Sequence, residues 1–135
     1  MQAASPAFLI DSHCHLDAAE FDGDRDAVIS RARAAGVGAQ VIPAVDAQSW
    51  EALARLCENH AGLHPAYGLH PTFLTQHRPQ DLVALGEWLT THRRCAVGEC
   101  GLDYHVEGLD RDAQLRYLDA QLALARDLDL PVILH

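Results

Sequence analysis

The sequence is short of long apolar runs. Nothing in its 135 residues approaches the roughly 18–20 consecutive apolar residues that a membrane-spanning helix needs, so we expect no membrane partner. The first residues, MQAASPAF, contain neither a basic region nor an apolar stretch of the length that a secretory signal peptide has. These absences predict a cytoplasmic protein.

Closely spaced cysteine pairs are also lacking. The four cysteines are Cys14, Cys57, Cys95 and Cys100, and no two of them form a CxxC pair. Since nothing suggests secretion, we interpret them as reduced thiols and expect Cys100 to be a small packed residue.

Positive charge is in deficit. Ten Lys and Arg residues stand against 19 Asp and Glu residues, and the formal net charge is −9 at pH 7. Phosphate binding requires a basic face, so we do not expect this chain to hold nucleic acid by bulk electrostatics. Bound metal ions could supply the local positive charge instead. The nine histidines are a high count that favours metal chemistry.

Short β-rich segments alternate with helix-like segments along the whole chain. The expected strands cover residues 8–11, 39–45, 65–69, 95–99 and 131–135, and the expected helices cover residues 25–35, 47–59, 80–92 and 111–128. Successive strands begin about 25 to 35 residues apart, the length of a βαβ unit, which predicts parallel strands with right-handed crossovers. The last helix places Leu115, Leu118, Leu122 and Ala125 on one stripe, which we expect to face the sheet.

This pattern predicts the α/β class, and within it about five parallel strands with four helices. A complete (β/α)8 barrel needs about 250 residues, so the chain has the length of an N-terminal half-barrel. We expect residues 1–135 to form a single domain that is the N-terminal portion of a longer chain. A half-barrel leaves its first and fifth strands open, and we expect a 135-residue form to associate with itself through them.

Histidines and acids stand where the expected strands end. His13 and His15 follow the first strand two residues apart, so their side chains should share one face, a spacing that suits a divalent metal. His70 ends the third strand in YGLHP, Glu99 and Asp103 end the fourth in VGECGLDY, and His135 ends the fifth. In a barrel, the carboxyl ends of the strands form the active-site rim.

The remaining candidates have more ordinary interpretations. Asp46 after the second strand suits a loop or a helix cap, and His64 should precede the third strand and be structural. We expect Trp50 and Trp88 to be core or interface residues. Solvated side chains are the expected state of His60, His77, His92 and His105.

The motifs DSHCHLD, GLHP, VGECGLDY and PVILH, in this order, closely resemble those of the TatD family of metal-dependent hydrolases. The resemblance runs from Phe8 to His135 and implies a TIM barrel with a two-metal site and DNase activity. It implies that His13 and His15 bind the first ion, that Glu99 bridges both ions and that His135 binds the second.

The resemblance also implies roles close to the substrate. His70 would lie near the substrate phosphate, whereas Asp17 and Asp103 would organise the rim or touch the substrate. A family histidine from strand six and a family aspartate from strand eight would lie beyond residue 135. Imidazole and carboxylate ligands accept Zn²⁺, Mn²⁺ or, where oxygen ligands dominate, Mg²⁺.

Three functions remain open at this stage. The leading one is hydrolysis of a phosphodiester, in DNA or in a small substrate, by metal-activated water. The same metals could act on an amide, a lactone or an aminoacyl ester, because substrate choice depends on the loops. The third is a catalytically incomplete half-barrel that needs a partner or the rest of its chain.

Overall fold

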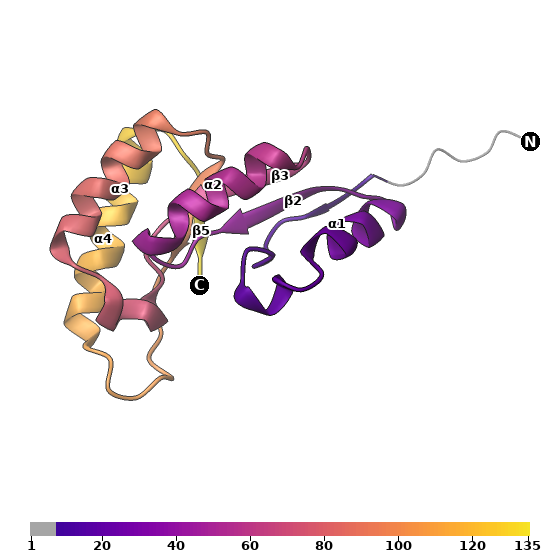
Figure 1. Cartoon of the computed structure of the whole chain (residues 1–135). Coiled ribbons are helices and arrows are strands. Elements are labelled where there is room, and N and C mark those ends of the chain that lie inside the picture. Colours follow the sequence, from indigo (N-terminus) through magenta and orange to yellow (C-terminus); the bar gives the residue numbers. More distant parts are fainter. Residues whose placement is uncertain (1–7) are drawn as a thin grey trace, which may run out of the picture.

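Five parallel strands form one sheet in the computed structural model, which describes residues 8–135 (Figure 1). The strands are β1 (Leu9–Asp11), β2 (Val37–Pro43), β3 (Leu63–Tyr67), β4 (Ala96–Cys100) and β5 (Val132–Leu134). Their spatial order, β1-β2-β3-β4-β5, is the order of the sequence. The expectation that the N-terminus carries no signal peptide falls on residues 1–7, outside the described part.

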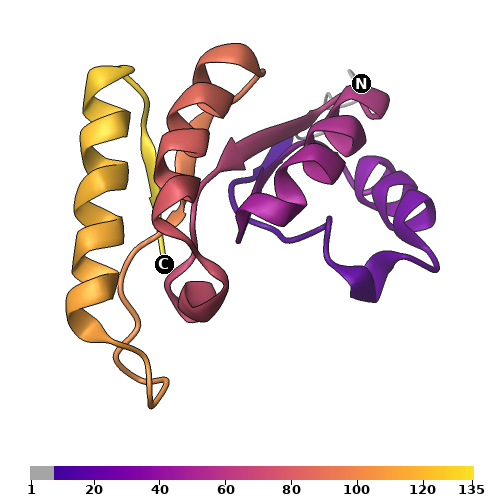
Figure 2. The ribbon, with the colours of Figure 1, turned by 60° about the vertical axis from the view of Figure 1, so that its left-hand side comes forward.

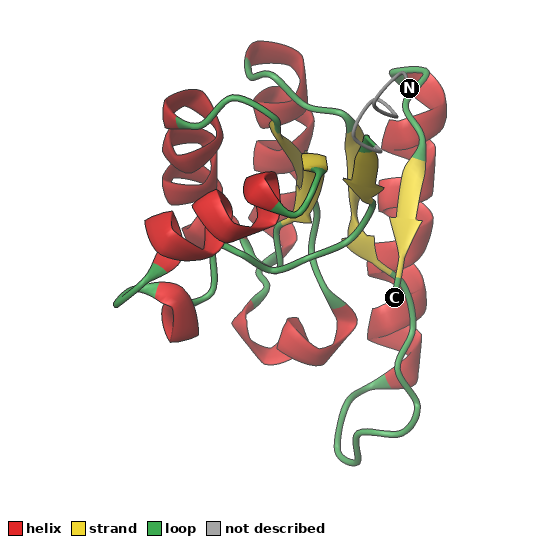
Figure 3. Ribbon diagram, turned by 90° about the vertical axis from the view of Figure 1, so that its right-hand side faces the viewer, coloured by secondary structure: helices red, strands yellow, loops and turns green. Residues whose placement is uncertain are grey.

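A helix follows each of the first four strands. The helices are α1 (Arg25–Ala34), α2 (Trp50–Asn59), α3 (Pro79–Thr91) and α4 (Arg111–Asp127), with short 3-10 segments η1 (Ala19–Phe21), η2 (Ala47–Ser49) and η3 (Pro71–Gln76). Figure 3 shows the strands in the middle of the molecule with helices around them. Sequential parallel strands joined by helices are half of a TIM barrel, which confirms the expected fold class.

β2 and β3 lie two residues earlier than the sequence predicts. Gly38 belongs to β2, and the ring of Phe8 occupies the space that a Cβ at this position would need. His64 therefore lies inside β3, and the expectation that it precedes this strand is wrong. The shift also means that loops, and not strands, carry the residues after Pro43 and Tyr67.

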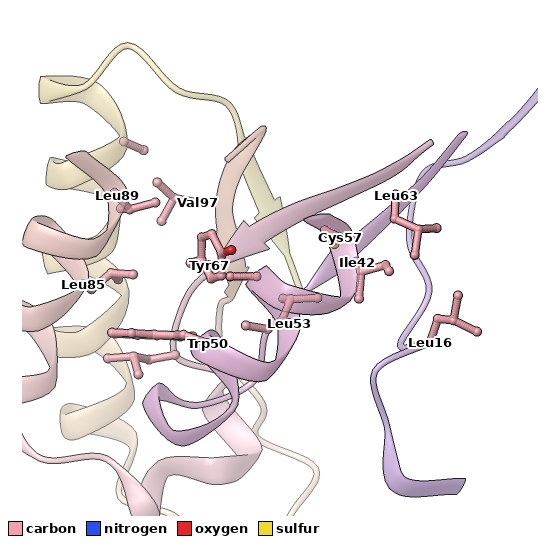
Figure 4. Close-up of a cluster of buried hydrophobic side chains, with 14 of the residues drawn as sticks. Leu16, Ile42, Trp50, Leu53, Cys57, Leu63, Tyr67, Leu85, Leu89 and Val97 are labelled. Atoms are coloured by element: carbon pink, nitrogen blue, oxygen red, sulfur yellow. The ribbon is translucent and has the colours of Figure 1, made fainter. Parts of the chain in front are cut away.

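The core fills the space between the sheet and α2 and α3 (Figure 4). Ile42, Leu63, Tyr67 and Val97 of the strands and Trp50, Leu53, Leu85 and Leu89 of the helices are almost completely buried. Each such side chain stabilises the fold by about 1.5–3 kcal/mol relative to an exposed one. Trp88 packs against the same core, so the expectation for both tryptophans is confirmed.

The buried face of α4 differs from the predicted one. Gln114, Gln121 and Ala125 are buried, whereas Leu115 and Leu122 of the expected apolar stripe are 41% and 40% exposed. The stripe was wrong for both leucines because two glutamine amides, and not leucine side chains, face the rest of the domain.

Both edges of the sheet expose apolar side chains. Among residues 8–135, β1 pairs only with β2, and β5 pairs only with β4. The edge residues Leu9, Ile10 and Leu134 are 52%, 63% and 60% exposed. In residues 8–135, none of the helices combines the length and apolar character that crossing a bilayer requires.

Candidate metal centre

The carboxylate of Glu99 lies at the centre of the candidate site. Glu99 is a residue of β4, and its side chain is only 4% exposed. His13, His70 and His135 follow β1, β3 and β5, and each places a ring nitrogen within 3.3 Å of a Glu99 oxygen. The parallel strands bring these side chains together because their carboxyl ends lie at the same rim. In Figure 2 the yellow strand β5 runs downward to the C-terminus, toward the side on which the orange loop after β4 extends.

One oxygen of Glu99 faces both histidines of the HxH motif. Oε2 lies 2.9 Å from His13 Nε2 and 3.0 Å from His15 Nε2, and the two nitrogens are 3.3 Å apart. An ion bonded at about 2.0–2.1 Å separates neighbouring ligand atoms by about 3 Å, so these three atoms have the spacing of ligands on one ion. Their chemistry fits too, since imidazole and carboxylate are the ligands of Zn²⁺ and Mn²⁺ sites.

The other oxygen of Glu99 faces a second group. Oε1 lies 2.9 Å from His135 Nδ1 and 3.3 Å from His70 Nε2. Glu99, His70 and His135 also have the spacing of metal ligands, so Glu99 belongs to two candidate groups at once. A carboxylate shared in this way is what a bridging ligand requires.

The hydrogen bonds of His70 determine the tautomer of its ring. Its Nδ1 accepts a hydrogen bond from the backbone N–H of Thr72 at 3.1 Å, and the hydroxyl of Thr72 lies 2.9 Å away. A backbone N–H can only donate, so Nδ1 is unprotonated and Nε2 of the neutral ring carries the proton. Nε2–H therefore donates toward Glu99, and His70 is a hydrogen-bond donor in the centre, not a ligand through this nitrogen.

Asp103 lies beside His135. Its Oδ2 is 2.8 Å from His135 Nε2, and its Oδ1 accepts the backbone N–H groups of His105 and Val106. A carboxylate on the far nitrogen of an imidazole fixes the ring orientation and leaves the near nitrogen free for an ion. Here the near nitrogen is Nδ1, which faces Glu99.

Asp17 does not join the cluster around Glu99. It is half-buried in the segment after the HxH motif, and burial raises the pKa of its carboxyl. His15 is close enough to lower this pKa in turn, so Asp17 lies at the margin of the site. The structure thus brings together six of the seven predicted residues.

The charges of the centre shift its pKa values. Burial alone would raise the pKa of Glu99, but hydrogen bonds from His15, His70 and His135 outweigh it and hold this pKa well below its usual range. The hydrogen bond to Glu99 in turn raises the pKa of His15. Burial by itself would lower the pKa of His135. Its hydrogen bonds to Asp103 and Glu99 outweigh this effect, so the pKa is raised. The centre therefore holds an ionised carboxylate surrounded by imidazoles that hydrogen-bond to it.

The sequence analysis did not predict the surroundings of two further histidines. His77 is not solvated as expected: its Nε2 lies 2.7 Å from the carbonyl oxygen of His70, and burial lowers its pKa. His92 is half-buried and stacks on Trp88. The sequence around His77 contains no pattern that predicts its contact with the His70 carbonyl.

Other expectations agree with the structure. Asp46 caps η2, accepting the backbone N–H of Ser49 at 2.9 Å, which is one of the two roles expected for it. Cys100 is fully buried, and all four cysteines are free thiols.

Known proteins share this fold and these motifs. A family described as TatD related DNase matches residues 10–135. The uncharacterized metal-dependent hydrolase YjjV of Escherichia coli is 42% identical over 128 residues, which are 93% of this chain and 49% of that protein. The 3'-5' ssDNA/RNA exonuclease TatD of Erwinia tasmaniensis is 36% identical over 94% of this chain and 49% of its own length.

The solved structures agree with the sequence matches. The crystal structure of YjjV, a TatD homolog, superposes with a TM-score of 0.90 over 94% of this chain and 50% of that one. A TatD-family hydrolase from Entamoeba histolytica, 21% identical, has the same fold with a TM-score of 0.76, over 98% of this chain and 50% of that one. The chain spans about half the length of the relatives it matches. With nearly all of its residues covered by the family match, the chain belongs to the TatD related DNase family.

Proposed function

We propose that this chain supplies one side of a two-metal centre that hydrolyses phosphodiester bonds, with DNA as the substrate class. The observation that carries the proposal is the placement of Glu99, whose two oxygens face two separate groups of histidines. Membership of the TatD related DNase family and the exonuclease named among its relatives support the substrate class.

In this proposal the first ion has three ligands from the chain, namely His13, His15 and Glu99. The second ion has two, Glu99 Oε1 and His135 Nδ1, and Asp103 keeps the His135 ring in place. Bound Zn²⁺, Mn²⁺ or Mg²⁺ lowers the pKa of a water molecule and offsets the charge of a phosphodiester. The ions therefore supply the positive charge that a chain of net charge −9 lacks.

His70 is proposed as the contact to the substrate. Its Nε2–H is held toward the centre by the Thr72 hydrogen bond to Nδ1, so it can donate to a phosphate oxygen without first gaining a proton. Asp17, at the margin of the site, is proposed to orient the rim or the substrate.

We also propose that residues 1–135 are a single domain that corresponds to the N-terminal portion of a TatD-like TIM barrel. The coverage of about half of each relative supports this correspondence. The remaining ligands expected of the family, a strand-six histidine and a strand-eight aspartate, would then come from the other half.

The test is hydrolysis in the presence of Mn²⁺, Zn²⁺ or Mg²⁺. End-labelled single-stranded DNA and bis(p-nitrophenyl) phosphate are the substrates, with a chelator as the metal-free control, for both the 135-residue form and the full reading frame. We expect metal-dependent cleavage of both substrates by the full reading frame, and far slower cleavage by the 135-residue form, in which two expected ligands are missing. Glu99→Gln should reduce the rate at least about a hundredfold, the scale of a single electrostatic stabiliser.

Glu58→Gln is the matched control, because it removes the same charge from an exposed position of α2. Its rate should equal that of the unaltered protein. Cleavage of esters or lactones with no cleavage of either phosphodiester would overturn the proposed substrate class. Full activity and full metal content in Glu99→Gln would overturn the bridging role.

A further inference from the structure

Two glutamines of α4 are as deeply buried as the leucines of the core. Gln114 and Gln121 are 1% and 0% exposed. They lie seven residues apart, about two helical turns, and so share one face of the helix. A buried amide must find hydrogen-bond partners, so the groups that these two amides bind show what this face of α4 does.

Gln121 holds the backbone of the residue before His70. The backbone N–H of Leu69 donates to Gln121 Oε1 at 2.8 Å, and Gln121 Nε2 donates to the Leu69 carbonyl at 3.2 Å. The two bonds join one amide to both polar groups of a single residue. They fix the position of the Leu69 backbone and thereby the position of the next residue, His70.

The chain makes room for this amide. A Cβ at position 68 would lie 3.0 Å from Gln121 Oε1 and 2.7 Å from the backbone of Gly98, so only glycine fits there. Other side chains hold the neighbouring backbone: Trp50 Nε1 donates to the Gly68 carbonyl, and His77 Nε2 lies 2.7 Å from the His70 carbonyl. These side chains hold the segment leaving β3 together with one backbone bond, in which the His70 N–H donates to the Val45 carbonyl at 2.8 Å.

Gln114 repeats this arrangement at the next strand end. The backbone N–H of Asp103 donates to Gln114 Oε1 at 2.7 Å, and Gln114 Nε2 donates to the Asp103 carbonyl at 2.8 Å. Asp103 in turn lies 2.8 Å from His135 Nε2. Gln114 therefore holds the backbone of the residue whose carboxylate orients His135.

We propose that α4 is a positioning helix: Gln121 sets the place of His70, and Gln114 sets the place of Asp103 and thereby of His135. Both are positioning residues, since neither touches Glu99. The proposal rests on the proposed function only for the roles of the two histidines, His70 as the substrate contact and His135 as a metal ligand. It predicts that the two glutamines affect different histidines of the centre.

The test uses ¹⁵N-histidine spectra of Gln114→Met and Gln121→Met in the full chain, without metal. Methionine keeps the length of the side chain and removes both hydrogen bonds. We expect Gln121→Met to change the imidazole nitrogen shifts of His70 and to leave those of His135 in place. Gln114→Met should do the reverse. Gln80→Met, at an exposed position of α3, is the matched control and should change neither.

A Mn²⁺ titration adds a second readout. Gln114→Met should weaken binding about tenfold, the lower end of the effect of residues that orient metal ligands, whereas Gln121→Met should leave it within about twofold. Failure of the unaltered protein to bind Mn²⁺ would count against the proposed function. The histidine spectra are recorded without metal, so they would still test the positioning roles.

Variants that fold and leave both histidine spectra unchanged would overturn the inference, as would equal changes at both histidines in both variants. If either methionine variant does not fold, amide exchange in the unaltered protein decides. The side-chain N–H groups of Gln114 and Gln121 should then exchange at least about a hundredfold more slowly than those of Gln80, because exchange from buried hydrogen bonds requires opening. Exchange as fast as at Gln80 would overturn the inference.

Discussion

At the scale of single residues, the two oxygens of Glu99 organise the centre. Oε2 faces His13 and His15, and Oε1 faces His70 and His135. The first group offers three ligand atoms to one ion, and the second offers only two once the proton on His70 Nε2 is counted. The chain by itself should therefore hold one ion more tightly than the other.

Metal affinity should depend on pH more than it does for ordinary imidazoles. Metals bind the neutral ring, so protons compete with them. Glu99 raises the pKa of His15, and Asp103 and Glu99 raise that of His135, above the usual imidazole value. A raised pKa leaves the ring protonated to higher pH, so Mn²⁺ affinity should be weak at acid pH and keep rising above the usual imidazole pKa of about 6.5.

Isothermal titration with Mn²⁺ over a series of pH values checks this expectation. In Glu99→Gln the affinity should be lower throughout, and its pH dependence should move to lower pH, because the anion that raises the pKa of His15 is gone. An affinity that is constant on both sides of pH 6.5 would contradict the assignment of these imidazoles as ligands.

At the scale of elements, the site depends on how closely the backbones at β3, β4 and β5 approach one another. A Cβ at position 68 would meet the backbone of Gly98 at 2.7 Å, and one at position 98 would meet the carbonyl of Ile133 at 2.6 Å. Glycines at these two positions let the strand ends converge, and this convergence places His70 and His135 next to one another at the same oxygen of Glu99.

Gly68→Ala should therefore destabilise the domain. Overpacking against backbone that cannot move away costs about 1–3 kcal/mol, and a loss of this size should be measurable by chemical denaturation. Gly23→Ala is the control, since a Cβ at position 23 meets nothing within 4 Å. Equal stability of the two variants would show that β3 and β4 can separate without cost.

At the scale of the whole molecule, the open sheet is the dominant feature. A closed barrel has no edges, but here β1 and β5 each have a strand neighbour on one side only among residues 8–135. The apolar side chains of Leu9, Ile10 and Leu134 are more than half exposed at these edges. Unpaired apolar edges are templates for pairing with another chain.

The 135-residue form should consequently self-associate, and sedimentation velocity over a concentration series should detect it. Ile10→Lys places a charge on the edge strand β1 and should weaken association by roughly tenfold, which corresponds to about 1.4 kcal/mol. Val83→Lys is the control, because Val83 is similarly exposed, at 68% against 63% for Ile10, but lies on α3. Monomeric behaviour at all concentrations, or an equal effect of both variants, would contradict edge pairing.

Much of this protein could be predicted from the sequence. The alternation of apolar strands and helices predicted five parallel strands and four helices, because a βαβ repeat has few other solutions. Parallel strands also end at one rim, so residues at the strand ends, such as His13, Glu99 and His135, could be predicted to meet before any coordinates were known. The details of the strands were less predictable: β2 and β3 begin two residues early because strand pairing, and not local propensity, sets where a ladder starts.

Only the tertiary structure decided how the centre is built. Which oxygen of Glu99 faces which histidine, and which nitrogen of His70 carries the proton, depend on contacts between segments far apart in the sequence. The buried face of α4 was missed for the same reason. Helical periodicity reports where apolar residues lie, whereas Gln114 and Gln121 are buried because two loop backbones at the ends of β3 and β4 need hydrogen-bond partners. Those backbones become available only when the strands have come together, so no local pattern in the sequence can reveal them.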